Sequence, residues 1–368
     1  MKAIRAILTL SLLLAGSMAA AQTSNAPPRL YFWLWWANLE GQWKEMIDFT
    51  AAQKMDGVVI WGLGGFRGQA ERCREIVAYA HAKNVKVIYG FGLNGYDSGN
   101  AIVSQHPELA ATMPENLANT AKGRESRANI FCPSKPESLA LLKQYLLAAA
   151  DTGVDGFNFE TADVDYITCH CPECEKRFQS AGETVISNKP LDWALEHLQI
   201  AADTLLSKHP DLWLSCEFRM IAFNKPPYAE CDRILELTRK IDQRMTVVWA
   251  DSSSSPTAAM ASRLLAERQN LGFYIRSGAM LGWKAKQLLP PEEFQSIARS
   301  LLPLKPACVF YRAYRPCDRF AVNMGVAAQL LHNPHMPATE LKGVVGDLEE
   351  MIKPGARYFG SPKDPVAD

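Results

Sequence analysis

The 368-residue sequence has no net charge, because 39 Lys and Arg residues balance 39 Asp and Glu residues. This balance excludes a polyanion held by bulk charge, so we expect no nucleic-acid partner. Beyond the N-terminus, no apolar run is long enough to cross a bilayer, and we expect no membrane span. The chain also lacks a Ser-His-Asp elbow, and its seven histidines show no metal-ligand spacing apart from His170. Composition leaves the oligomeric state open.

A glycine-rich phosphate-binding turn is missing as well. After the first predicted strand the chain reads Trp35-Trp36-Ala37-Asn38, where an open doubly wound sheet usually has such a turn. Its absence favours a closed barrel over an open sheet.

The first 21 residues have the pattern of a secretion signal. Lys2 and Arg5 form a basic start, residues 7–15 are apolar but too few to span a bilayer, and small residues precede Gln22. The sequence therefore predicts an exported protein, periplasmic or secreted, whose mature chain begins near Gln22.

Eight short β-type runs alternate with helical stretches, which is the pattern of βα units and a parallel sheet. The runs are 30–36, 57–62, 85–91, 155–160, 212–218, 245–251, 272–276 and 307–312. The helical stretches are 42–53, 69–83, 137–150, 174–209, 230–241, 256–269, 292–302 and 318–331. Eight units in order predict an α/β fold, a (β/α)8 TIM barrel with a closed parallel sheet, over residues 28–353.

Two segments stand out from this repeat. Residues 94–130 form a long loop after the third strand, which on a barrel lies at the active face. Residues 354–368 are rich in Pro and Gly and are expected to be a flexible tail. The helix after the long loop has its own start signal, because Ser134 and Glu137 have capping-box spacing and Pro136 suits a first turn.

The fourth run ends on a carboxylate. Phe157 and Phe159 alternate with Asn158 and Glu160, so Glu160 is expected to face the lumen at the carboxyl end, where active sites of this fold lie. A partly dry cleft raises the pKa of a carboxyl group, as a general acid near neutral pH requires. The alternative is a structural Glu160 paired with an arginine.

Glycosidic bond cleavage usually needs a second carboxylate. Alternation in the fifth run predicts that Glu217 and Arg219 face the lumen, and Asp251 ends the sixth run. Glu217 is either catalytic or paired with Arg219. Glu160 and Glu217 lie on neighbouring strands and are expected to be close, whereas Asp251 leaves a larger gap. The seventh run has no acid, which slightly favours Asp251 as a base or as an orienter of the substrate's own group.

Three of the nine cysteines crowd into a C-x-C-x2-C array made of Cys169, Cys171 and Cys174. This spacing suits a zinc ion, since three thiols so close in sequence are poor disulfide geometry. Cys132, after the long loop, is the predicted fourth ligand, with His170 as the alternative. Four thiolates leave no open position, so the zinc is expected to be structural. The competing interpretation is a pair of disulfides among the four cysteines.

The segment from Asn158 to Phe178 resembles the family-42 β-galactosidases and related uncharacterised barrel hydrolases. The resemblance implies Glu160 as acid/base, and structural zinc ligands Cys132, Cys169, Cys171 and Cys174. The chain departs from that family at Phe159, where the family has Asn, and at Arg276 and Ser277, where the family has its nucleophilic Glu at the end of strand 7.

Aromatic and arginine residues recur at or near the carboxyl ends of the predicted strands. Aromatic faces pack against the C–H faces of sugar rings, and arginine forks carboxylates and sulfates bidentately. Several converging arginines favour an anionic sugar, such as a uronate or a sulfated unit. Equally weighted alternatives are core aromatics and arginines paired with Glu217, Asp251 and Asp318. The predicted substrate-binding residues are Asn158, Asp163, Trp35, Trp61, Arg219, Trp249, Arg276, Trp283 and Arg312.

These features predict a glycoside hydrolase that cleaves an O-glycosidic bond of an oligo- or polysaccharide by carboxylate acid/base catalysis. Glu160 is the proton donor, with Glu217 or Asp251 as the second group. The alternative is an exported barrel that binds glycan without cleaving it, because strand 7 lacks the acid. A metal-dependent deacetylase or lyase is disfavoured, since an all-thiolate zinc has no open position.

Overall fold

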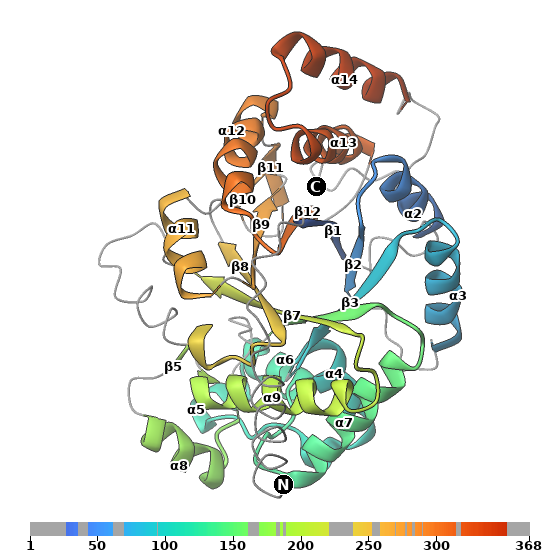
Figure 1. The fold of residues 1–368 in the computed structure, drawn as a ribbon. Coiled ribbons are helices and arrows are strands. Elements are labelled where there is room, and N and C mark those ends of the chain that lie inside the picture. Colours follow the sequence, from blue (N-terminus) through green and yellow to red (C-terminus); the bar gives the residue numbers. More distant parts are fainter. Residues whose placement is uncertain are drawn as a thin grey trace, which may run out of the picture.

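Eight parallel strands close into a barrel, and they follow one another around it in chain order (Figure 1). The computed structural model describes residues 27–35, 43–61, 70–93, 95–160, 169–181, 185–186, 189–220, 238–251, 258–268, 270–276, 278–281, 284–288, 290–313 and 318–351. The barrel strands are β1 (Arg29–Trp35), β2 (Gly57–Trp61), β3 (Lys86–Gly92), β4 (Gly156–Glu160), β7 (Trp213–Met220), β8 (Met245–Asp251), β9 (Leu271–Arg276) and β12 (Cys308–Ala313). Each predicted run corresponds to one of them, and the predicted (β/α)8 fold is confirmed.

Helices between the strands surround the barrel (Figure 1). They are α2 (Trp43–Ala52), α3 (Ala70–His81), α7 (Pro136–Ala150), α9 (Leu191–Leu206), α11 (Ala258–Glu267), α12 (Pro291–Leu301) and α13 (Asp318–His332). A helix that was not predicted, α14 (Ala338–Met351), packs on α13. The predicted stretch 174–209 is two helices, α8 (Pro172–Ala181) and α9, separated by the hairpin of β5 (Val185–Ile186) and β6 (Lys189–Pro190). Most of the predicted helix 230–241, the leader and the tail lie outside the described residues.

The segment predicted as a loop over 94–130 is largely helical. It contains α4 (Tyr96–Gln105), η2 (Pro107–Leu109), α5 (Glu115–Ala118) and α6 (Ala121–Asn129). The helix α4 forms because Ile102 and Val103 bury their side chains in the core around β3 and α7. A second hairpin, β10 (Gly278–Leu281) with β11 (Lys284–Leu288), follows β9.

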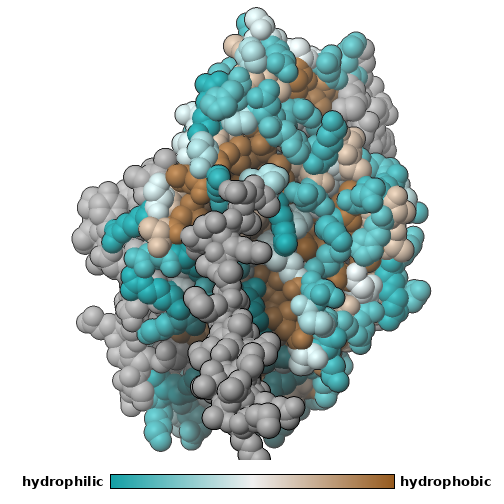
Figure 2. Space-filling view, viewed as in Figure 1, coloured by the Kyte–Doolittle hydropathy of each residue, from teal (hydrophilic) through white to brown (hydrophobic). Residues whose placement is uncertain are grey.

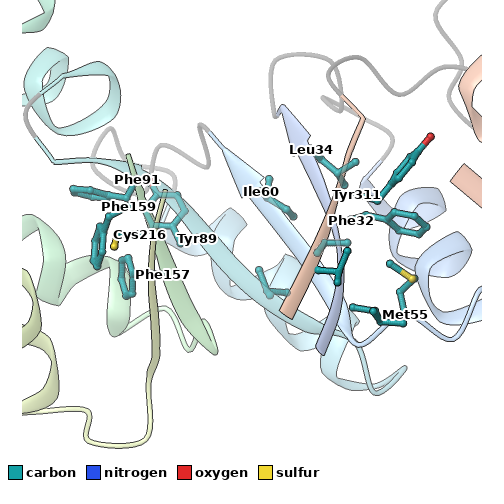
Figure 3. Close-up of a cluster of buried hydrophobic side chains, with 14 of the residues drawn as sticks. Phe32, Leu34, Met55, Ile60, Tyr89, Phe91, Phe157, Phe159, Cys216 and Tyr311 are labelled. Atoms are coloured by element: carbon teal, nitrogen blue, oxygen red, sulfur yellow. The ribbon is translucent and has the colours of Figure 1, made fainter. Parts of the chain in front are cut away.

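Alternation along each strand divides the apolar residues into two cores. Phe157 and Phe159 belong to the outer core between the strands and the helices, where Figure 3 shows them beside Tyr89, Phe91 and Cys216. The lumen core consists of Tyr31, Trp33, Val59, Trp61, Ile88, Val248, Tyr274, Cys308 and Phe310. Both faces of the sheet are therefore apolar, as expected for parallel strands covered on both sides.

Strand register decides which lumen side chains share a level. The register path from Glu160 through β7, β8, β9 and β12 reaches Arg29, and the path from Trp33 through β2 and β3 reaches Gly156. The two paths are offset by four residues on β1, from Arg29 to Trp33, and by four residues on β4, from Gly156 to Glu160. Together these offsets amount to eight residues, which is the shear number of this fold. Side chains from alternate strands then share a layer. One layer includes Glu217, Tyr274 and Trp33, and the layer above it includes Glu160, Arg312 and Trp61.

The start of α7 differs from its predicted capping box. Pro136 occupies the first turn as expected, but Lys135 is the N-cap residue and no side chain caps the helix. Ser134 instead places its Oγ 3.1 Å from the Sγ of Cys174. The Ser134 hydroxyl therefore contacts a sulfur that is distant in sequence, instead of capping the helix as the local pattern predicted.

Hydrophilic residues cover much of the described surface in the face shown in Figure 2, with hydrophobic side chains visible between them. Among the described residues, no helix has both the length and the apolar character needed to cross a membrane.

Candidate functional site

Glu160 is the last residue of β4, at the carboxyl end of the barrel. Its side chain is only 4% exposed, and its neighbours Phe157 and Phe159 face the helices. The carboxylate therefore belongs to the lumen layer nearest the strand ends that the structure describes. Strand-to-helix loops begin at this edge, which is where a barrel of this kind binds substrate.

Glu217 is the register partner of Glu160 on the next strand, β7. Neighbouring strands lie about 4.8 Å apart, so the two carboxylates project into the lumen side by side. Glu217 is fully buried. Two adjacent buried carboxyl groups do not both ionise readily, because like charges in a medium of low dielectric repel each other.

A hydrogen-bond network surrounds Glu217. The Oε2 atom accepts from Asn158 Nδ2 at 3.0 Å and from the hydroxyl of Tyr274. The Oδ1 atom of Asn158 in turn accepts from Ser215 Oγ at 2.9 Å. Asn158 is fully buried, two residues before Glu160 on β4. Its amide thus holds Glu217, and the substrate-binding role of Asn158 stays a prediction.

Arg312 lies across the lumen from β4, in the same layer as Glu160. Its guanidinium carbon is 4.0 Å from the centre of the Trp33 ring and 5.9 Å from that of Tyr274. Trp61 packs against Trp33 with 5.7 Å between ring centroids. The layer thus has an acid on one side, and a cation and an indole on the others.

Trp249 is not in the lumen. It belongs to the outer core with Val247, whereas Val248 between them faces inward. Successive side chains of a strand point to opposite faces of the sheet, so the Trp249 ring lies on the face that packs against the helices. This corrects the substrate-binding role predicted for Trp249.

The structure gives less detail for the other predicted substrate-binding residues and for Asp251. Backbone positions, without described side chains, are available for Trp35, Arg219, Asp251 and Arg276. Asp163 and Trp283 lie outside the described residues. Asp251 is the register partner of Met220, three residues beyond Glu217 along β7.

Tyr274 and Ser215 are site residues that the sequence analysis missed. Tyr274 stands two residues before Arg276 on β9, and Ser215 two residues before Glu217 on β7, so each shares the face of a residue that was predicted. That spacing was the available signal. A hydroxyl group within an apolar strand does not indicate that a carboxylate from another strand will lie next to it.

The four predicted cysteine ligands come together in one cluster. The Sγ atoms of Cys132, Cys169, Cys171 and Cys174 all lie within 4.8 Å of one another. The Cys132 sulfur is 3.7 Å from that of Cys171 and 3.8 Å from that of Cys174. A tetrahedral zinc with bonds of about 2.3 Å places its sulfur ligands about 3.8 Å apart, so the spacing fits this ion. A disulfide needs about 2.05 Å, and the four thiols are free.

Contacts among the sulfurs shift the pKa values of the cysteines in opposite directions. The backbone N–H of Thr112 donates to Cys169 Sγ at 3.3 Å, and hydrogen bonds from Cys132 and Cys174 lower the pKa of Cys169. The hydrogen bond with Cys169 raises the pKa of Cys132, and the hydrogen bond with Cys132 raises the pKa of Cys174. The His170 ring contacts Glu175 through Nδ1 and does not belong to the cluster. The alternative that made His170 the fourth ligand is therefore not supported by its position. Cysteines from the segment after β3 and from the segment after β4 meet here, so the cluster joins these two segments.

Comparisons by sequence find no matching family model and no matching curated protein. Solved structures share the fold. A mutant of the O-GlcNAc hydrolase of Thermobaculum terrenum has a TM-score of 0.56 at 12% identity, over 87% of this chain and 63% of that one. A GH20 exo-β-N-acetylglucosaminidase from Vibrio harveyi, in complex with N-acetylglucosamine, has a TM-score of 0.59 at 11% identity, over 89% of this chain and 58% of that one.

A GH20 β-N-acetylhexosaminidase from Streptomyces coelicolor A3(2) has a TM-score of 0.58 at 13% identity, over 92% of this chain and 72% of that one. The chain spans less than two thirds of the length of the first two neighbours. At these identities the comparisons show a shared fold, and the family-42 resemblance stays a prediction. The described chain is a (β/α)8 barrel of the kind found in these glycoside hydrolases.

Proposed function

We propose that the protein is a glycoside hydrolase in which Glu160 donates a proton to the leaving oxygen. The observation that carries this proposal is the register pairing of Glu160 with Glu217 at the carboxyl edge of the barrel. Two buried carboxylates side by side are the minimal machinery for acid-catalysed cleavage of a glycosidic bond. The barrel shared with solved glycosidases supports the same class of reaction.

Glu217 is the second carboxylate in this proposal. It replaces Asp251, which the sequence slightly favoured. Its side chain faces the lumen one layer below Glu160 and accepts two hydrogen bonds. The backbone of Asp251 pairs three residues further along β7. Carboxyl groups about 5–5.5 Å apart lead to retention of anomeric configuration, and a register pair on adjacent strands favours that range.

The substrate proposed is an anionic oligo- or polysaccharide. Arg312 is 4% exposed and its guanidinium carbon lies 4.0 Å from the centre of the Trp33 ring, so a planar donor set is available in the layer of Glu160. A guanidinium binds a carboxylate or a sulfate with two parallel hydrogen bonds. Trp61, in the same layer, offers a ring against which a sugar can pack.

A structural zinc ion is proposed for the four-cysteine cluster. Its sulfur spacing matches a tetrahedral thiolate site, and the ion would tie the segment after β3 to the segment after β4. A site closed by four protein ligands contributes folding energy and leaves the chemistry to the carboxylates. Export to the periplasm or the medium also remains a proposal.

Turnover by the purified mature protein on a panel of neutral, uronate-containing and sulfated oligosaccharides tests the function. Glu160→Gln is expected to reduce turnover by about 10²–10⁴-fold, with much of the loss recovered on substrates with very good leaving groups. Glu340→Gln, an exposed position on α14, is the matched control and should retain activity. Unchanged turnover in Glu160→Gln would refute the assignment. Binding without any cleavage would support the glycan-binding barrel instead.

A further inference from the structure

Tyr274 links two strands of the barrel that are not neighbours. Its hydroxyl, from β9, donates to Glu217 Oε2 on β7, and Asn158 from β4 donates to the same oxygen at 3.0 Å. Tyr274 is 1% exposed and Asn158 is fully buried, so bulk water does not compete for these bonds. Two donors therefore converge on one carboxylate oxygen at the floor of the candidate site.

Both donors are held in place by groups other than Glu217. Ser215 donates to Asn158 Oδ1 at 2.9 Å, so the amide turns its Nδ2 group toward the carboxylate. The Tyr274 ring packs edge-on against Phe310 with 5.2 Å between centroids. A phenylalanine ring would fill the same space, and the hydroxyl therefore has a role that packing does not require.

Hydrogen bonds to a buried carboxylate stabilise its ionised form. Burial and the charge of Glu217 raise the pKa of Tyr274 well above its usual value, so the phenol stays protonated and remains a donor. When one of two adjacent carboxyl groups is held ionised, the other retains its proton.

We propose that Tyr274 is a positioning residue that, with Asn158, holds Glu217 as a carboxylate beside a protonated Glu160. The charged and titratable groups around Glu217 in the described structure are Glu160 from β4, Tyr274 from β9 and Arg312 from β12. The catalytic meaning of this arrangement rests on the proposed glycosidase function. The division of charge between the two carboxyl groups does not, and it can be measured without a substrate.

Infrared difference spectroscopy during a pH titration detects protonated carboxyl groups directly. In the wild type, the protonated-acid band at neutral pH should disappear in Glu160→Gln. In Glu217→Gln the same band should be lost at lower pH than in the wild type, because the neighbouring charge that retains the Glu160 proton is gone. In Tyr274→Phe, the titration of Glu217 should move to higher pH, and Asn158→Ala should move it in the same direction. Tyr31→Phe is the matched control, because Tyr31 is a lumen tyrosine that stacks on Trp213. An unmoved Glu217 titration in both variants, or a neutral-pH proton on Glu217, would overturn the proposal.

Kinetics supply the second readout. Tyr274→Phe should lower kcat by about 10- to 100-fold, the range for losing a hydrogen bond to a charged group, with little change in KM. The acidic limb of its pH–rate profile should move upward, because Glu217 then ionises at higher pH. A wild-type profile for Tyr274→Phe beside an inactive Glu217→Gln would reduce Tyr274 to a packing residue. If the infrared shifts occur but no glycan is cleaved, the result supports the positioning role of Tyr274 and contradicts the glycosidase function.

Discussion

The Arg312 guanidinium lies 4.0 Å from the centre of the Trp33 ring, in a lumen where Arg312 is 4% exposed. This contact joins a cation of one layer to an aromatic ring of the layer below. A guanidinium also has a planar set of donors, which is the property that distinguishes arginine from lysine as an anion binder.

Arg312→Lys keeps the charge but loses the planar fork, so we expect KM for anionic glycans to rise about tenfold, as loss of a desolvated cation–π contact and one hydrogen bond would give. Arg312→Met should abolish the preference for anionic over neutral glycans. Steady-state kinetics on matched uronate and neutral oligosaccharides measure both effects. An unchanged preference in Arg312→Met would show that this residue does not select the substrate.

Glu217 and Asp251 are distinguished by exchanging each for its amide. Glu217→Gln should reduce kcat by at least about 10²-fold, because it removes the carboxylate beside Glu160, whereas Asp251→Asn should have a smaller effect. The anomeric configuration of the first product, followed by NMR, should show retention. A larger loss in Asp251→Asn together with inversion would restore Asp251 as the base.

The cysteine cluster is expected to hold about one zinc ion per chain, because its sulfur spacing matches a tetrahedral site. Metal analysis of protein purified without chelator measures the stoichiometry. Cys174→Ser should lose the metal and lower Tm, whereas Cys73→Ser should keep the metal, since Cys73 is a buried thiol that contacts Thr152 away from the cluster. A metal-free wild-type protein with these thiols oxidised would favour disulfides.

Asp155 should make stability depend on pH. Burial raises its pKa, but hydrogen bonds from Lys86, from the backbone N–H of Val87 and from His81 outweigh burial and lower the pKa below its usual value. A group with a lowered pKa stabilises the fold above its unfolded pKa, and this stability is lost as the pH falls through the folded pKa.

Asp155→Asn should therefore lower the free energy of unfolding by about 1–2 kcal/mol at pH 7, and the deficit should shrink below about pH 4. Urea denaturation at the two pH values measures this difference. A deficit that stays constant would show that the charge of Asp155 is not its source.

Gly90 leaves room for the Trp61 indole. A Cβ atom at Gly90 would lie 2.3 Å from Trp61 Cδ1, so Gly90→Ala must displace the ring and should cost about 1–3 kcal/mol of stability. Gly343→Ala is the matched control. A Cβ there meets nothing within 4 Å, and alanine in a helix should add about 0.5–1 kcal/mol. Thermal denaturation compares the two, and equal changes in Tm would refute the steric explanation.

Local pattern was sufficient for the eight barrel strands and for the residues that end them, but it missed the helices within 94–130 and α14. The eight strands follow from short apolar runs between helical stretches, and Glu160 at a strand end and the spacing of Cys169, Cys171 and Cys174 are readable without a fold. These features depend on residues close in sequence. Period-two alternation also separated Phe159 from Glu160 correctly, because a carboxylate and a phenylalanine differ so strongly in their cost of burial.

The closed barrel decided the register of the strands, the face of the sheet on which each side chain lies, and the contacts between residues distant in sequence. Trp249 lies among apolar residues on both faces of β8, so composition does not tell which face meets the helices, and closure assigned it to the outer core. Tyr274 reaches Glu217 only because the shear of eight places alternate strands in one layer. Ser134 contacts Cys174, distant in sequence, instead of capping its helix, because the segments before α7 and at the start of α8 meet in the folded chain. The sequence by itself determined which side chains exist at the carboxyl ends of the strands, whereas the tertiary structure determined which of them meet, since contacts between strands depend on the register of the whole sheet.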